Sequence, residues 1–345
     1  MAAAPQRLSP SSSSSSSSSS FLPVREVGTL KLPAILNGLW QLSGAHGQID
    51  EAQAVKEMSS YVDAGLPGFD MADHYGPAEI LYGAFLQEYR GSHRVYGLTK
   101  WVPPPGPMLR PIVEANIQRS LHRMKVGSLD MLQFHWWDYH DERYLDALRV
   151  MKALRDEGKI KNLALTNFDT VHMKKILDSG IPIVSNQVAY SVIDTRPEKG
   201  MVQWCLQNNV KLLTYGTLLG GLLSDKYLGK PEPRVTNLNT VSLKKYMQTI
   251  RQWGGWSLFQ ELLSTLRSIA DKYNISIANV GVRYIADKPA VGAVIIGARL
   301  SISGHVEDNL RTFSFPGLDS DDIQRIELVV RKGKVLRGDC GDEYR

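Results

Sequence analysis

The feature that most constrains this chain is a regular alternation of short apolar runs with longer amphipathic stretches. Eight runs have the length of a buried strand, and they lie at residues 34–40, 68–71, 94–100, 130–135, 160–167, 182–187, 211–215 and 290–297. Helix-like stretches fall between them, at residues 51–65, 78–90, 108–125, 141–157, 169–179, 197–209 and 257–273. Strands that alternate with helices pair in parallel. Eight such units in about 300 residues predict a closed (β/α)8 TIM barrel.

An open doubly wound α/β sheet is the alternative architecture. It usually carries a glycine-rich nucleotide fingerprint after its first strand, or a phosphate-binding loop. Neither pattern occurs in this sequence. One segment interrupts the barrel rhythm, because residues 222–255 are rich in Gly, Pro, Lys and Asn. Such a long connection is expected to be a functional lid or a disordered insertion.

Composition excludes several classes of protein. The chain has 345 residues, 40 Lys and Arg against 35 Asp and Glu, and a net charge of +5, which is too small and too dispersed to indicate nucleic-acid binding. No run reaches the roughly 18 apolar residues of a membrane helix. The two cysteines, Cys205 and Cys340, lie too far apart in sequence for a Cys-x-x-Cys metal or redox site. A reduced intracellular compartment fits this cysteine usage.

The first residues differ from the rest of the chain. Residues 11–20 are ten consecutive serines, and no acidic residue precedes Glu26. This composition predicts a disordered segment, and it is typical of an organelle transit peptide. We therefore expect a leader over residues 1–26, a barrel over 27–333 and a solvated basic tail over 334–345. Few arginines favour import into the chloroplast stroma over mitochondria, and a plain tail on a cytoplasmic protein is the alternative.

Polar side chains stand at or just beyond the ends of the apolar runs, where a barrel places its chemistry. Asp70, Tyr75, Lys100 and His135 form a chemically coherent set. A tyrosine hydroxyl is a weak acid, and a neighbouring lysine held by an aspartate is expected to lower its pKa. The set predicts a general acid that protonates a carbonyl oxygen. With no nucleophilic Ser or Cys evident, the attacking group would be a hydride from a nicotinamide.

Residues 28–315 resemble the aldo-keto reductases, which are NAD(P)H-dependent (β/α)8 enzymes. The resemblance rests on GFDMADHYGPAE, LTK and LDMLQFHWWD, in the order of the family. It implies a catalytic tetrad of Asp70, Tyr75, Lys100 and His135, with Tyr75 as the proton donor. The reaction implied is the NADPH-dependent reduction of an aldehyde or ketone to an alcohol.

The same resemblance implies a set of cofactor-binding residues, with Thr166 standing where the family usually has serine. LTNF and SNQVAYS are similar to the segments that bind the nicotinamide carboxamide, LLTYGTLLGGLLSDKY to the stacking tyrosine and the pyrophosphate loop, and VIIGAR with VEDNL to the adenosine end. The implied residues are Leu39, Trp40, Gln48, Asp70, Thr166, Asn167, Gln187, Tyr215, Gly216, Leu218, Gly221, Lys226, Arg234, Gly297, Arg299, Asp308 and Asn309.

Arg299 is placed to pair with a 2′-phosphate, which favours NADPH over NADH. Trp40, Trp101 and Trp136 follow strand ends and are expected to line an apolar substrate pocket. No metal is expected, since the histidines around His135 lack a metal-ligand spacing. The partner expected is a small carbonyl compound, and neither nucleic acid nor membrane.

A second class of function stays open. The potassium-channel β subunits resemble this family and act mainly as cofactor-binding regulatory partners, and Gln48, Lys226 and Arg234 are similar to that branch. The sequence indicates neither which carbonyl is reduced nor an oligomeric state.

Overall fold

The barrel expected from the sequence is present. The computed structural model describes residues 22–44, 46–47, 49–302 and 304–345. Its eight parallel strands close in the order β10-β3-β4-β5-β6-β7-β8-β9, so neighbours in sequence are neighbours in the barrel. The strands are β3 (Ile35–Gly38), β4 (Gly68–Asp70), β5 (Tyr96–Trp101), β6 (Met131–Phe134), β7 (Leu163–Thr166), β8 (Ser185–Ala189), β9 (Lys211–Tyr215) and β10 (Val291–Gly297). The prediction of a (β/α)8 TIM barrel is therefore confirmed.

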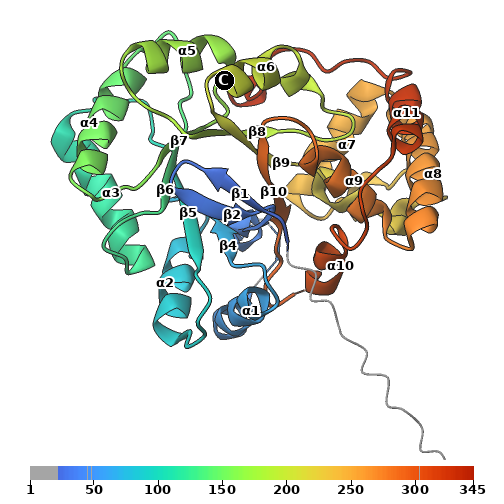
Figure 1. Ribbon diagram of the computed structural model, residues 1–345, viewed down its shortest axis with the longest axis horizontal. Coiled ribbons are helices and arrows are strands. Elements are labelled where there is room, and N and C mark those ends of the chain that lie inside the picture. The colour runs from blue at the N-terminus through green and yellow to red at the C-terminus, as the bar shows by residue number, and fades with distance from the viewer. Residues whose placement is uncertain (1–21, 45, 48, 303) are drawn as a thin grey trace, which may run out of the picture.

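Helices surround the strands on the outside of the barrel (Figure 1). They are α1 (Glu51–Asp63), α2 (Ala78–Glu88), α3 (Arg110–Met124), α4 (Tyr144–Asp156), α5 (Thr170–Asp178), α6 (Met201–Gln207), α7 (Val241–Trp253), α8 (Gly255–Tyr273), α9 (Ile277–Ala286), α10 (Val306–Arg311) and α11 (Ser320–Val330). Each helix-like stretch of the sequence coincides with one of them. Among the described residues, no helix combines the length and the apolar character that a membrane crossing requires.

Residues 222–255, which were predicted to form a lid or a disordered insertion, have a different structure. The second half of this segment is α7, which Thr240 caps by accepting a hydrogen bond from the Leu243 amide. The helix buries Met247, Ile250 and Trp253 against the core. Capping and apolar spacing therefore make this part of the insertion an ordinary packed helix.

A hairpin covers one end of the barrel. Strands β1 (Val24–Val27) and β2 (Leu30–Pro33) pair antiparallel and lie across the barrel opening in Figure 1. Asn162, just before β7, accepts a hydrogen bond from the Thr29 amide (2.9 Å) and donates one to its hydroxyl (2.9 Å). Because Asn162 precedes its strand, the hairpin closes the amino-terminal end of the barrel, and the carboxyl-terminal end is left for a site.

The solvated tail predicted at residues 334–345 is the clearest departure. In Figure 1 the red end of the chain leaves α11 and passes close to α6. Its last part packs against the barrel, with Cys340 only 1% exposed. Arg196 donates hydrogen bonds to Asp339 and Glu343 there. These contacts with Arg196 fix the segment against the barrel, and a local sequence pattern does not reveal them.

Candidate active site

Asp70 and Lys100 form a buried ion pair at the carboxyl ends of two adjacent strands, β4 and β5. Lys100 Nζ donates to Asp70 Oδ2 (2.5 Å) and to the Met71 carbonyl oxygen (3.0 Å). Burial lowers the pKa of Lys100, and the Asp70 carboxylate opposes that effect. A buried charge of this kind persists only with close partners, so the pair fixes both side chains at the mouth of the barrel.

Two amides hold the other oxygen of the same carboxylate. Gln133 Nε2 and Gln187 Nε2 donate to Asp70 Oδ1 at 2.9 and 2.8 Å, and Gln187 also donates to Gln133 Oε1 (2.6 Å). Gln133 was missed in the sequence, although an amide inside the apolar run of β6 was the available signal. Gln187, expected at the nicotinamide carboxamide, holds Asp70 through this hydrogen bond.

Tyr75 lies over Lys100, whose Nζ is 4.8 Å from the centre of the phenol ring. Burial raises the pKa of Tyr75 well above its usual value, and the Asp70 carboxylate adds to the rise. The expectation of a lowered pKa for Tyr75 is therefore wrong here, because burial and the negative charge of Asp70 both disfavour the phenolate. The hydroxyl keeps its proton at neutral pH and is in the form that a proton donor needs.

His135 follows β6 and is neutral. Burial lowers its pKa to about 4. Its Nδ1 lies 3.3 Å from the Thr166 carbonyl oxygen, which can only accept, so Nδ1 carries the ring proton and Nε2 is an acceptor. Nε2 is buried without a hydrogen-bond partner among the described residues. Such orphaned polar atoms are rare in folded proteins, which points to a ligand that donates to Nε2.

The three tryptophans expected in the substrate pocket behave differently. Trp40 packs beside Tyr75, with ring centres 4.9 Å apart, and is half-buried. Trp101 and Trp136 are each 2% exposed and pack against Phe134 in the core. Their assignment as pocket walls is therefore not supported, since of these three tryptophans only Trp40 is partly exposed and lies beside Tyr75.

Three of the residues expected at the nicotinamide end do come together. Thr166 donates to the Gln187 carbonyl oxygen (3.2 Å), and Asn167 is held in the left-handed region with φ 61°. Tyr215 donates to Asn167 Oδ1 (2.8 Å). These residues end strands β7 and β9 or follow them directly, so they form one edge of the same barrel mouth.

The expected pyrophosphate loop follows β9. Gly216 and Gly221 have φ of 72° and 97°, which favours glycine. A Cβ on Gly216 would lie 2.4 Å from the Tyr246 hydroxyl oxygen, so no side chain fits there. Leu218 is half-buried between the two glycines, and Lys226 and Arg234 are exposed farther along the chain. The Leu219 and Gly221 amides donate to carbonyl oxygens within the loop (both 2.9 Å), and the two cations lie at the surface.

The adenosine end is partly assembled. Gly297 is the last residue of β10 and lies against the Gln41 side chain. Arg299 donates through Nη2 to the His46 carbonyl oxygen (2.9 Å). Arg299 Nε is buried without a partner among the described residues. Asp308 and Asn309 lie on α10, separated from Arg299 in sequence.

Other predicted positions have different surroundings. Asp308 accepts a hydrogen bond from the Ser276 hydroxyl (3.1 Å). Asn309 and Leu39 are buried. Gln48, the remaining cofactor candidate, lies outside the described residues. His46 was missed in the sequence, and its Nε2 lies 2.9 Å from the Ser242 hydroxyl oxygen.

The chain is similar in sequence to several characterised proteins. It is 25% identical to the aldo-keto reductase YhdN of Bacillus subtilis, over 76% of this chain and 80% of that protein. It is 24% identical to the L-glyceraldehyde 3-phosphate reductase of Escherichia coli, over 89% and 91%. It is 31% identical to flagellar radial spoke protein 5 of Chlamydomonas reinhardtii, but only over 46% of this chain and 33% of that longer protein.

The fold is shared with solved structures. The glycerol dehydrogenase AKR11B4 of Gluconobacter oxydans superposes with a TM-score of 0.77 at 19% identity, covering 93% of this chain and 98% of that one. An aldo-keto reductase of Klebsiella pneumoniae in complex with NADPH superposes with a TM-score of 0.68 at 21% identity, covering 90% and 95%. The sequence profile of the aldo/keto reductase family matches residues 34–331, so the chain belongs to the aldo/keto reductase family.

Proposed function

We propose that this protein reduces a small aldehyde or ketone to an alcohol with NADPH, and that Tyr75 donates the proton. The observation that carries the proposal is the cluster at the barrel mouth. A protonated tyrosine lies beside the buried Asp70–Lys100 pair and Trp40, and a neutral histidine offers an unpartnered Nε2. Membership of the family supports the same reaction class.

The residues present fit a dinucleotide. The fit rests on the unpartnered buried Nε of Arg299 and on the glycine loop after β9, where a Cβ on Gly216 would lie 2.4 Å from the Tyr246 hydroxyl oxygen. Asn167 and Tyr215 would hold the nicotinamide end, the loop amides the pyrophosphate, and Arg299 the 2′-phosphate. When bound, NADPH supplies a hydride to the carbonyl carbon. The NADPH complex of the Klebsiella reductase agrees with this choice of cofactor.

The chain's own residues manage the proton. The high pKa of Tyr75 keeps its hydroxyl protonated until negative charge develops on the carbonyl oxygen. The Lys100 ammonium next to the ring then stabilises the phenolate that forms, and Asp70 holds Lys100 in place. His135 Nε2, as an acceptor, takes a hydrogen bond from the new hydroxyl.

The direct test is turnover with a panel of carbonyl compounds. We expect the purified protein to oxidise NADPH when given small aldehydes or ketones, measured by loss of absorbance and by detection of the alcohol. The panel should include a phosphorylated aldehyde, since a relative is named for reducing one. Binding of NADPH with no carbonyl-dependent oxidation above background would contradict the enzyme and support the cofactor-binding regulatory alternative.

The compartment is a separate proposal. We propose that the serine-rich, acid-free residues 1–26 direct the protein to plastids, a proposal that rests on composition alone. Residues 1–21 lie outside the described part of the structure. A fluorescent protein carrying residues 1–30 is expected to accumulate in the plastid stroma. The control is a fusion that begins at residue 27 and therefore lacks the expected leader. A diffuse cytosolic signal from the fusion that carries residues 1–30 would contradict import into plastids.

A further inference from the structure

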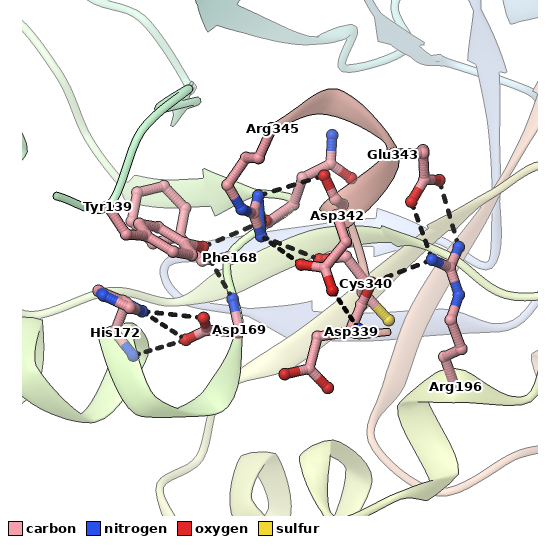
Figure 2. Close-up of polar contacts among 12 residues, drawn as sticks. Tyr139, Phe168, Asp169, His172, Arg196, Asp339, Cys340, Asp342, Glu343 and Arg345 are labelled. Atoms are coloured by element: carbon pink, nitrogen blue, oxygen red, sulfur yellow. Dashed lines mark hydrogen bonds and ion pairs between the residues drawn. The ribbon is translucent and has the colours of Figure 1, made fainter. Parts of the chain in front are cut away.

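The part of the chain from Asp339 to Arg345, here called the strap, is anchored on a buried arginine. Arg196 Nη1 donates to Glu343 Oε2 (2.8 Å) and to the Asp339 carbonyl oxygen (3.0 Å), while Nη2 donates to Asp194 (2.8 Å). Figure 2 shows Glu343 facing this guanidinium. The Arg196 side chain is 8% exposed, so the anchor is shielded from water and from salt screening.

The other end of the strap is held by a second arginine, whose partner is a candidate nicotinamide residue. Arg345 donates through Nη1 and Nη2 to the Asn167 carbonyl oxygen, both at 2.9 Å. Its guanidinium lies 4.2 Å from the ring centre of Tyr139, beside which it is drawn in Figure 2. The Arg345 side chain is 11% exposed. These contacts make a fitted site for Arg345 at the barrel mouth.

Between the two arginine anchors the strap backbone lies directly on Asn167. Gly341 has φ 90°. A Cβ built on Gly341 would lie 2.5 Å from Asn167 Cβ and 2.6 Å from its carbonyl oxygen. Only glycine permits this approach, so the docked strap can be displaced by adding one methyl group.

The strap places Tyr344 at the reaction site. Lys245, from α7, donates to the Tyr344 hydroxyl, and its Nζ lies 4.3 Å from the Tyr344 ring centre and 5.6 Å from that of Tyr215. The ring of Tyr344 is 6.2 Å from that of His135, measured between centres. Tyr344 therefore lies between the residue expected to stack on the nicotinamide and the residue expected to contact the new hydroxyl.

We propose that the strap is an internal occupant of the reaction site, with Tyr344 and Arg345 covering Tyr215 and Asn167 where the nicotinamide end and the carbonyl compound would bind. The inference rests on the proposed function, because that function assigns those two residues to the cofactor. Docking and binding are then mutually exclusive. The apparent affinity for NADPH is reduced by the fraction of molecules in which the strap is docked, so undocking the strap activates the protein.

The sharpest test is Gly341→Ala, which pushes the strap off Asn167 and changes no polar group. We expect its Kd for NADPH, measured by fluorescence titration, to fall about tenfold, as for a strap docked in about nine molecules of ten. Carbonyl-dependent kcat/KM is expected to rise in parallel. In hydrogen exchange, the Tyr344 and Arg345 amides, which donate within the strap at 2.9 and 3.2 Å, should exchange faster in Gly341→Ala and in wild type saturated with NADPH.

Tyr344→Ala provides a second route and should also tighten NADPH binding. Arg337→Ala changes an exposed residue outside the strap and should behave as wild type. Unchanged or weaker NADPH binding in both Gly341→Ala and Tyr344→Ala would overturn the proposal, since the strap would then be a structural wall of the site. Tighter NADPH binding without turnover of any carbonyl would instead uphold the strap and refute the proposed reductase.

Discussion

Replacing Tyr75 with phenylalanine is expected to reduce carbonyl reduction by about 10²–10⁴-fold, the usual contribution of a general acid, which corresponds to about 2.7–5.4 kcal/mol. The ring still packs between Trp40 and Lys100, so the Kd for NADPH should stay close to that of wild type. The measurement is kcat/KM with the best carbonyl of the panel, together with a fluorescence titration of NADPH.

The reason for so large an effect is the local arrangement of proton donors. His135 is neutral, because burial lowers its pKa to about 4, and its Nε2 is an acceptor, so it cannot replace the lost proton. Lys100 is committed to Asp70 and to a backbone carbonyl. Tyr89→Phe, which removes an exposed hydroxyl that donates to Asp63 (2.8 Å), is the matched control and should leave kcat/KM unchanged. Substantial activity in Tyr75→Phe would show that another group delivers the proton.

Replacing Arg299 with alanine is expected to weaken NADPH much more than NADH. A hydrogen bond to a charged group contributes about 1.5–3 kcal/mol, so the Kd for NADPH should rise by about 10–150-fold. NADH lacks the 2′-phosphate and serves as an internal reference. Isothermal titration with both cofactors gives the ratio directly.

Two further variants refine this second test. Arg299→Lys keeps the charge but loses the planar fork, so an intermediate loss for NADPH is expected. Arg325→Ala removes a half-buried arginine of α11 that donates to Ser268 (2.9 Å), and both cofactors should bind as in wild type. Arg299 also donates to the His46 carbonyl oxygen. An equal loss of affinity for NADPH and NADH would mean that Arg299 only supports the segment around His46 and does not bind the 2′-phosphate.

Local periodicity was sufficient for the architecture. A buried parallel strand is a short apolar run, and a covering helix repeats its apolar face along the chain, so the eight barrel strands and seven of the helices were visible in their own residues. The second half of the 222–255 insertion was missed because the Gly- and Pro-rich first half masked the spacing of Met247, Ile250 and Trp253. The hairpin of β1 and β2 was missed because β1 is not a buried apolar run, since Val24, Arg25 and Glu26 are not buried and only Val27 is.

The candidate site was only partly readable. Asp70, Lys100 and His135 could be placed together from sequence because the carboxyl ends of parallel strands meet at one edge of a barrel. The direction of the shift in the Tyr75 pKa could not be predicted from sequence, because it depends on how deeply the folded chain buries the phenol beside Asp70. The burial of Trp101 and Trp136 likewise depends on how the surrounding aromatic side chains pack.

The sequence by itself determined the barrel, the family and the residues that could carry hydride and proton chemistry, because these depend on spacing within single elements. Only the tertiary structure decided which groups are protonated, which polar atoms lack partners, and that residues 339–345 lie on the site. Arg345 contacts Asn167 across 178 positions of sequence. A contact of that separation is set by the path of the folded chain, and local spacing does not encode it.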